Sequence, residues 1–273
     1  MYVGAGSMAE GMIAGMQASD RLQNEQIHVT NRSNAKRLLE LEDRYGITAI
    51  PREKVDWHSM DVIILAMKPK DMTAALIDLQ EKVQKGQLIL SVAAGIQNEQ
   101  IEHYLPDNQP VVRIMPNTSS TIGESATAIA PGKHISADQL ALVKELVRTF
   151  GEAFVIDEEQ MDVFTGMAGS GPAYFYKLLE HFEETGVAAG FDRETARKIG
   201  TRTMLGAARM LLETTEGPSV LRKKVTSPNG TTAAGLKALN EAGAGEAMAE
   251  AILSAAARSN EISEELKKQL LAR

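Results

Sequence analysis

The stretch Gly4-Ala5-Gly6-Ser7-Met8-Ala9 is the main sequence evidence for the fold. Its Gly-x-Gly-x-x-Ala spacing is typical of a dinucleotide-binding turn, in which the first glycine makes a tight turn and the second lets backbone approach a pyrophosphate. The small third position lets the following helix pack on the strand. A plain strand–turn–helix would share this spacing, but the stretch leads directly into a helical pattern from Met8 to Ala18, which favours the nucleotide-binding interpretation.

The first part of the chain, to about residue 156, alternates short apolar runs with amphipathic segments. Alternation at this spacing predicts a predominantly parallel sheet with helices on both faces, an α/β Rossmann-type domain. The runs expected as strands are Tyr2-Val3, 27–30, 62–66, 88–91, 111–115, 126–130 and 153–156, and the clearest helices are 33–44, beginning with Ser33 as its cap, and 137–148.

The expected first strand is unusually short. Only Met1, Tyr2 and Val3 precede Gly4, whereas strands usually have five or six residues. We therefore expect the natural chain to carry a segment before Met1, which intact-mass measurement and N-terminal sequencing of the natural protein would test.

The strand signals stop at about residue 158, and the rest of the chain predicts helices only. The expected helices are 172–189, 192–214 with Asp192 as its cap, a short one from Pro218, 232–240 and 245–270. They are rich in alanine and glycine, which suits close packing at a subunit interface but also reflects helix propensity alone. The sequence thus predicts two domains, a Rossmann domain at 1–158 and an all-α domain at 159–273.

The composition excludes several classes of function. A net charge of −7 argues against nucleic-acid binding, which calls for a basic face. No apolar run approaches the length that crosses a membrane. The chain has no cysteine, which favours a reducing, cytoplasmic compartment, and its five histidines lack ligand-like spacing, so we expect no metal.

The segment after the second expected strand, Asn31-Arg32-Ser33, bears on the choice of cofactor. NAD-specific folds usually carry an acid at this position for the ribose hydroxyls, and an acid would repel a 2′-phosphate. Hydrogen-bonding side chains with one positive charge, and Lys36 one turn later, instead predict NADP(H), with NAD(H) as the alternative.

A hydroxyl-rich turn, Thr226-Ser227-Pro228-Asn229-Gly230-Thr231-Thr232, lies in the helical half. Amides at a helix start and the helix dipole favour an anion, so the turn suits a small carboxylate, although a capped helix start is the commoner use of such residues. The turn contains no His, Asp, Glu or Lys that could serve as a strong acid or base. A ketone substrate would need a proton donor, whereas a cyclic imine can bind already protonated.

Read together, these loops, the run Gly169-Ser170-Gly171-Pro172-Ala173-Tyr174 and the segment 225–235 resemble the pyrroline-5-carboxylate reductase family, most closely its Bacillus-type members. The resemblance spans nearly the whole chain, and the Ser-Pro-Asn-Gly-Thr-Thr segment is its most specific part. It implies reduction of 1-pyrroline-5-carboxylate to L-proline with NADPH or NADH, the last step of proline biosynthesis. It also implies an all-α C-terminal dimerisation domain that forms interlocked dimers, in many members assembled as decamers.

Carried onto this chain, the resemblance assigns three sets of residues. Those for the cofactor are Gly4, Ala5, Gly6, Ser7, Met8, Asn31, Arg32, Ser33, Ala66, Met67, Lys68, Pro69, Val92, Ala93 and Ala94. Those for the substrate carboxylate are Ser227, Gly230, Thr231 and Thr232. Thr232 is also the expected catalytic residue, with its hydroxyl orienting the ring nitrogen rather than acting as a strong base.

Two other functions are weighed against this one. A β-hydroxyacid dehydrogenase shares the two-domain plan but requires Gly-x-Gly-x-x-x-Lys; here Gly169 and Gly171 place Phe175 at the lysine position, and Lys177 is rotated by about 200° along a helix. A non-catalytic, NADP-binding regulatory paralogue would show an eroded carboxylate turn, and this turn is intact.

Overall fold

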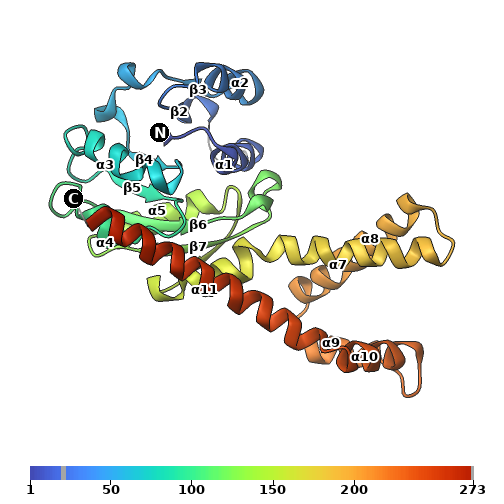
Figure 1. The fold of residues 1–273 in the computed structure, drawn as a ribbon. Helices are drawn as coiled ribbons and strands as arrows, with labels where there is room; N and C mark the ends of the chain where they lie inside the picture. The colour runs from blue at the N-terminus through green and yellow to red at the C-terminus, as the bar shows by residue number, and fades with distance from the viewer. Residues whose placement is uncertain (20–22, 272–273) are drawn as a thin grey trace. The chain divides into compact units, whose positions relative to one another are not determined.

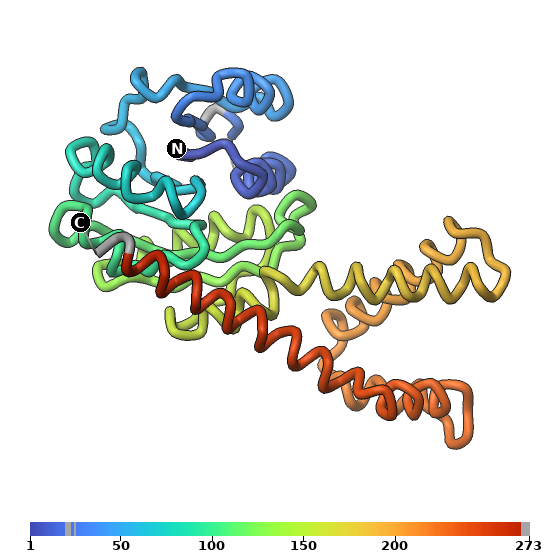
Figure 2. The backbone as a smooth tube through the Cα atoms, in the orientation of Figure 1, coloured from blue at the N-terminus to red at the C-terminus, as the bar shows by residue number. Residues whose placement is uncertain are grey.

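The computed structural model describes residues 1–19 and 23–271. The chain forms two compact units, Met1–Ser170 together with Leu253–Arg273, and Gly171–Ile252. The last helix, α11 (Ala244–Leu271), belongs to both units and is followed as one continuous helix in Figure 2.

The first unit is built on an eight-stranded sheet with the order β3-β2-β1-β4-β5-β6-β7-β8 (Figure 1). Neighbouring strands are parallel except for the antiparallel pair β6–β7. The strands are β1 Tyr2–Val3, β2 His28–Thr30, β3 Thr48–Ala49, β4 Val62–Leu65, β5 Leu88–Ser91, β6 Val111–Met115, β7 Ser125–Pro131 and β8 Gly151–Val155.

Two apolar cores cover the two faces of this sheet, because successive residues of a strand point to opposite faces. Ile64 and Leu90 pack in one core with residues of α1, α2 and α5, and Ile63 and Ile89 pack in the other with residues of α3 and α4. The helices are α1 Ser7–Ala18, α2 Ala35–Tyr45, α3 Met72–Gln80, α4 Asn98–Glu102, α5 Ala137–Val147 and α6 Met161–Phe164, the last continued by a π-helical turn, Thr165–Gly169.

The second unit is helical and contains α7 Gly171–Ala188, α8 Arg193–Glu213, α9 Pro218–Lys224, α10 Thr231–Glu241 and the first part of α11. Helices α7 and α8 pack as an antiparallel pair in which Glu183 of α7 is ion-paired with Arg193 and Arg197 of α8, the second at 2.6 Å. Asp192 caps α8 by accepting a hydrogen bond from the Thr195 amide, as the sequence predicts.

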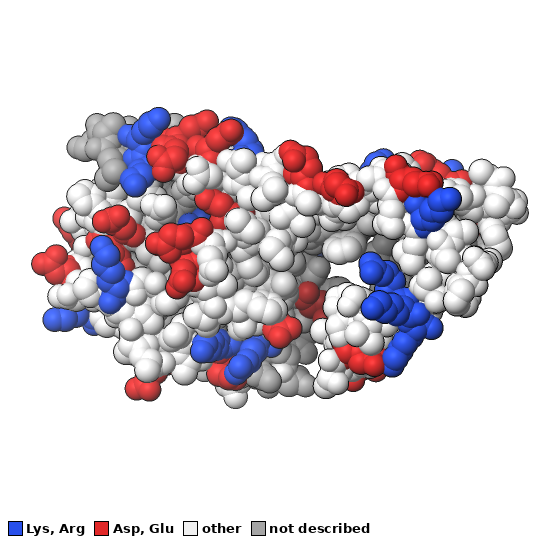
Figure 3. Space-filling view, turned by 90° about the horizontal axis from the view of Figure 1, so that it is seen from below, with Lys and Arg blue, Asp and Glu red and all other residues white. Residues whose placement is uncertain are grey.

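The helical unit leaves many large apolar side chains exposed. On the face drawn in Figure 3, uncharged surface separates small groups of basic and acidic residues. Large exposed apolar areas mark surfaces that associate with other proteins. The exposed apolar residues of this unit include Phe175, Tyr176, Leu178, Phe182, Phe191, Ile199, Met210, Leu211, Leu212 and Leu239.

The structure confirms the predicted fold class and places a strand at each expected run. It adds β3, α3 and α4, which the sequence analysis did not identify, and it shows that Asn34 rather than Ser33 caps α2, through a 3.0 Å hydrogen bond from the Arg37 amide. The compact units also divide differently from 1–158 and 159–273. α6 packs against β7, and the end of α11 packs against the first unit.

Candidate functional site

Four of the predicted cofactor segments lie at one edge of the sheet. β2, β1, β4 and β5 are adjacent and parallel, so the segments that follow them, beginning at Asn31, Gly4, Ala66 and Val92, leave from the same side. The chain's strand order reverses at β1, with β2 and β3 on one side and β4 on the other. Open α/β sheets bind ligands at such a switch point, outside the carboxyl ends of the strands.

The glycine loop makes a close contact with the loop after β4. Gly4 has a φ of +119°, and a Cβ on it would stand 2.5 Å from the Ala66 carbonyl oxygen. Its amide also donates a 2.8 Å hydrogen bond to the Thr30 carbonyl. Only glycine satisfies both the conformation and the space at this position.

The loop leaves room for a phosphate at the start of α1. Gly6 is the N-cap of that helix and provides no side-chain cap, and the space where its Cβ would stand is empty. The first amides of α1, from Ser7 and Met8, are therefore free of side-chain capping, and amides at a helix start bind anions. This end of the first unit fits the pyrophosphate of a dinucleotide.

The Asn31 side chain stabilises the turn formed by the segment Asn31–Ser33. The Asn31 carboxamide oxygen accepts a 2.9 Å hydrogen bond from the Asn34 amide, which turns the chain into α2. Arg32 is 80% exposed, and its nearest charged partner is Asp71, at 3.4 Å. An exposed ion pair of this kind contributes little to stability, so the Arg32 guanidinium is available to a ligand.

The loop after β5 is supported by the end of α11. Gly95 has a φ of +76°, and a Cβ there would lie 3.0 Å from a methyl group of Leu266 and 3.2 Å from one of Ile262. Nearby, the Ser259 hydroxyl donates a 2.6 Å hydrogen bond to Asp162. No local sequence signal predicts this support, because α11 and the loop are separated by more than half of the chain.

The predicted carboxylate turn has an open helix start. The Gly230 amide donates a 3.1 Å hydrogen bond to the Ser227 carbonyl, and Asn229 has a φ of +59°, which after Pro228 is the pattern of a type II turn. Gly230 is the N-cap of α10 and provides no side-chain cap. The amides of Thr231 and Thr232 begin the helix as the sequence predicts, and both residues are exposed.

The chain just before this turn carries positive charge. The last turn of α9 holds Arg222, Lys223 and Lys224, of which Lys224 is paired with Glu216 at 2.6 Å. Figure 3 shows a group of basic residues on the visible face of the helical unit. Positive charge next to a helix start favours an anionic ligand.

Lys177, the lysine out of register with the dehydrogenase pattern, forms an ion pair within its own helix. It lies on α7, its side chain is 63% exposed, and its ammonium group pairs with Glu180 one turn later at 3.0 Å. The hydrogen bond that the Lys177 ammonium donates to the Glu180 carboxylate raises the pKa of Lys177.

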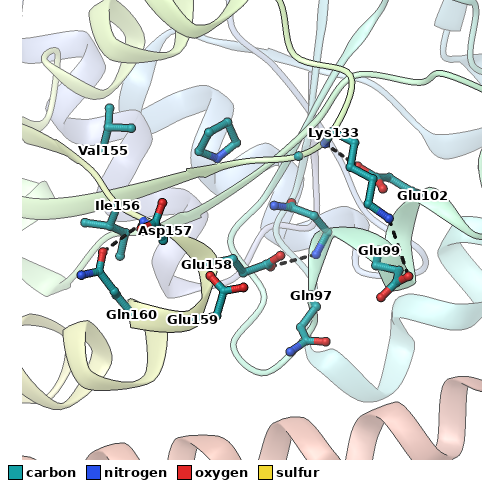
Figure 4. Close-up of a pocket in the computed structure, with 13 residues that line it drawn as sticks. Gln97, Glu99, Glu102, Lys133, Val155, Ile156, Asp157, Glu158, Glu159 and Gln160 are labelled. Atoms are coloured by element: carbon teal, nitrogen blue, oxygen red, sulfur yellow. Dashed lines mark hydrogen bonds and ion pairs between the residues drawn. The ribbon is translucent and has the colours of Figure 1, made fainter.

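A cavity of about 580 Å³ lies elsewhere in the first unit and contains none of the predicted site residues (Figure 4). The charged residues of its lining are acidic except for Lys133, whose ammonium group lies 3.7 Å from Glu99. Glu158 accepts a 2.9 Å hydrogen bond from the Asn98 amide and lies 3.5 Å from the buried Arg113. Burial raises the pKa of Glu158 and lowers that of Arg113. An acidic lining disfavours a phosphate-bearing cofactor or a carboxylate substrate.

Over residues 1–19 and 23–271, no cluster of three or more His, Cys, Asp or Glu side chains is arranged to hold a metal ion. Within the same residues, no helix has the length and apolar character needed to cross a membrane.

Comparison with known proteins gives two family matches. Residues 158–262 match the model for pyrroline-5-carboxylate reductase dimerisation, and residues 2–95 match that for NADP oxidoreductase, coenzyme F420-dependent. Pyrroline-5-carboxylate reductase 1 of Bacillus spizizenii is 56% identical over 98% of this chain and 90% of its own length.

Solved structures show the same similarity. A pyrroline-5-carboxylate reductase from Coxiella burnetii superposes with a TM-score of 0.88 at 31% identity, covering 96% of this chain and 97% of that one. The Plasmodium falciparum pyrroline carboxylate reductase, solved with NADP bound, shares the fold with a TM-score of 0.84 at 22% identity, again covering 96% of this chain and 97% of that one.

Gly95→Ala tests the support of the loop after β5. The added methyl group meets Leu266, Ile262 and the Ser263 backbone, so the loop must shift. We expect the Kd for NADPH, measured by fluorescence titration, to rise about tenfold, since a shift of a few tenths of an ångström misplaces several contacts at once.

Gly123→Ala is the matched control. Gly123 has the same φ of +76°, but the space where its Cβ would stand is empty. Both variants carry the conformational cost of about 1–2 kcal/mol in unfolding free energy, measured by urea denaturation. If Gly123→Ala weakened NADPH binding as much as Gly95→Ala, contact with α11 would not be the cause.

Proposed function

The chain belongs to the pyrroline-5-carboxylate reductase family, and on that basis we propose that it reduces 1-pyrroline-5-carboxylate to L-proline with NADPH, the last step of proline biosynthesis. It is an oxidoreductase that uses a pyridine nucleotide. The structural observation that supports the substrate assignment is the uncapped start of α10, which follows a hydroxyl-rich turn and a basic helix end.

The cofactor is proposed to bind along the edge of the first unit where β1, β2, β4 and β5 end. The amides of Gly6, Ser7 and Met8 would hold the pyrophosphate, with Gly4 and Ala5 shaping the turn. The loops after β4 and β5 would line the path from the adenosine to the nicotinamide; they contain Ala66, Met67, Lys68, Pro69, Val92, Ala93 and Ala94.

NADPH is proposed as the preferred coenzyme because Asn31–Ser33 contains no acid. Arg32 is exposed and the Ser33 side chain is also exposed, so both can reach a 2′-phosphate. Asp71 lies 3.4 Å from Arg32 and offsets part of its positive charge. The attraction of Arg32 for a 2′-phosphate is weaker as a result, which leaves NADH as a usable alternative.

The substrate carboxylate is proposed to rest on Ser227, Gly230, Thr231 and Thr232. The Ser227 hydroxyl lies in the space beside Gly230, so hydroxyl and amide donors are concentrated at the start of α10. Donors of this kind at a helix N-terminus suit a single small anion.

For this reaction, the turn at residues 226–232 has only to position the substrate. A nicotinamide bound at the edge of the first unit would supply the hydride for the carbon of the C=N bond. Because the cyclic imine can bind already protonated, its nitrogen needs no further acid, which agrees with the absence of His, Asp, Glu or Lys from residues 226–232. Thr232 is proposed to orient the ring nitrogen through its hydroxyl, and alignment then provides most of the rate enhancement.

Self-association follows from the dimerisation family match and from the apolar surface of the helical unit. We propose interlocked dimers in which a second copy covers the exposed residues of α7 and α8. A decamer of such dimers stays a prediction. A cytoplasmic location is proposed because the chain carries no cysteine and its reaction consumes a cellular pool of reduced nucleotide.

Arg32→Ala tests the coenzyme preference. Loss of a charge-assisted hydrogen bond to the 2′-phosphate should lower the ratio of kcat/KM for NADPH to that for NADH by about tenfold, with kcat for NADH little changed. Arg258→Ala, which removes an exposed arginine of α11 paired only with acids of its own helix, is the control. An unchanged ratio in Arg32→Ala would refute the role of Arg32.

Thr232→Ala tests the orienting role. We expect kcat/KM for 1-pyrroline-5-carboxylate to fall on the order of tenfold to a hundredfold, because the ring loses its alignment with the hydride donor, while the Kd for NADPH is retained. In the control Thr214→Ala, the lost hydroxyl bonds only to the Met210 carbonyl at the end of α8. Wild-type kcat/KM in Thr232→Ala would show that the assignment is wrong.

A further inference from the structure

We propose that Arg37 of α2 is a positioning residue for the cofactor, one that sets the direction of the glycine-loop amides without touching the nucleotide itself. This inference rests on the proposed binding of the dinucleotide at Gly4–Met8. Arg37 is not part of the predicted site, and its position within an amphipathic helix gives it the sequence signature of an ordinary surface arginine.

Arg37 joins three elements through one guanidinium group. Its Nε donates a 3.0 Å hydrogen bond to the Ala5 carbonyl oxygen, in the middle of the glycine loop. Its Nη2 is ion-paired with the Glu10 carboxylate in the first turn of α1. The side chain is 23% exposed, so most of it is screened from water. Only the planar fork of an arginine presents two donors to two acceptors in this way.

The bond to Ala5 controls the next amide. The peptide between Ala5 and Gly6 is planar and trans, so its carbonyl and its N–H point in opposite directions. With the carbonyl held toward Arg37, the Gly6 N–H faces away from α2. Gly6 continues from this peptide in an extended conformation, with φ −78° and ψ 179°, as the N-cap of α1, so the orientation of the peptide influences the direction in which the first amides of that helix begin.

The ion pair with Arg37 reduces the repulsion between the Glu10 carboxylate and a bound pyrophosphate. A carboxylate in the first turn of α1 lies close to where the pyrophosphate is proposed to bind, and two anions there would repel each other. Here Glu10 also accepts hydrogen bonds from Arg44 at 2.7 Å and from the Tyr45 hydroxyl at 3.1 Å. Burial alone would raise the pKa of Glu10, but the hydrogen bonds from Arg37 and Tyr45 and the two arginine charges together lower it. The carboxylate is thus held by α2 and its charge is compensated.

Arg37→Met tests this role by direct binding. We expect the Kd for NADPH and the Kd for NADH, both measured by fluorescence titration without substrate, to rise by similar factors of about tenfold. The NADPH/NADH ratio should stay at its wild-type value, because both coenzymes carry the pyrophosphate. If only NADPH binding weakened, Arg37 would be a contact of the 2′-phosphate, and the proposal would be overturned.

Arg44→Met is the matched control. Arg44 also pairs with Glu10, but it is 64% exposed and makes no hydrogen bond to the glycine loop. We expect it to bind both nucleotides within about twofold of the wild-type chain. If Arg44→Met weakened binding as much as Arg37→Met, compensation of the Glu10 charge alone would explain the effect, and positioning through Ala5 would be refuted.

Arg37→Lys separates charge from geometry and keeps the test valid if Arg37→Met does not fold. An ammonium group preserves the positive charge beside Glu10 but lacks the planar fork that holds both acceptors. We expect this variant to fold, as judged by circular dichroism, and still to bind both nucleotides more weakly than the wild-type chain. Wild-type affinity in Arg37→Lys would overturn the proposal. Failure of the wild-type chain to bind either nucleotide would instead refute the proposed cofactor site.

Discussion

The close approach of Gly4 to the Ala66 carbonyl shapes the edge of the sheet at which we propose that the nucleotide binds. It brings the turn after β1 against the loop after β4 at the point where the strand order reverses. No side chain fits at Gly4, and the next glycine, Gly6, leaves the first amides of α1 without a side-chain cap. The exposed Arg32 and the hydrogen bond from Arg37 to Ala5 belong to the same edge, around a turn whose backbone conformation requires glycine at position 4.

Much of this edge could be predicted from the sequence because its signals are local. Gly-x-Gly-x-x-Ala, the apolar runs and the missing acid at Asn31–Ser33 each lie within a few residues, and periodicity supplies the sheet. Arg37 and the end of α11 could not be found in this way, since their partners, Ala5 and Gly95, lie far away in sequence. Ser33 and Asn34 are both residue types that cap helices, so only the observed hydrogen bond identifies Asn34 as the cap of α2.

In the helical unit the sequence predicts the local structure but not what stabilises the unit. Its helices and the turn at Ser227–Thr232 follow from caps, proline positions and the left-handed Asn229, all of which are local. Its stability does not follow from this chain alone, because large apolar side chains of α7 and α8 remain exposed. Burial of that surface by a second copy would supply the hydrophobic stabilisation that the single unit lacks.

This chain reduces a cyclic imine rather than oxidising a hydroxy acid. The most direct measurement follows nucleotide absorbance in two reactions of the purified protein, NADPH with 1-pyrroline-5-carboxylate and NADP with 3-hydroxy acids, and quantifies L-proline. We expect NADPH oxidation that depends on 1-pyrroline-5-carboxylate, with one L-proline formed for each NADPH consumed and no NADP reduction by 3-hydroxy acids. NADP reduction by a 3-hydroxy acid, or no turnover in either reaction, would contradict this expectation.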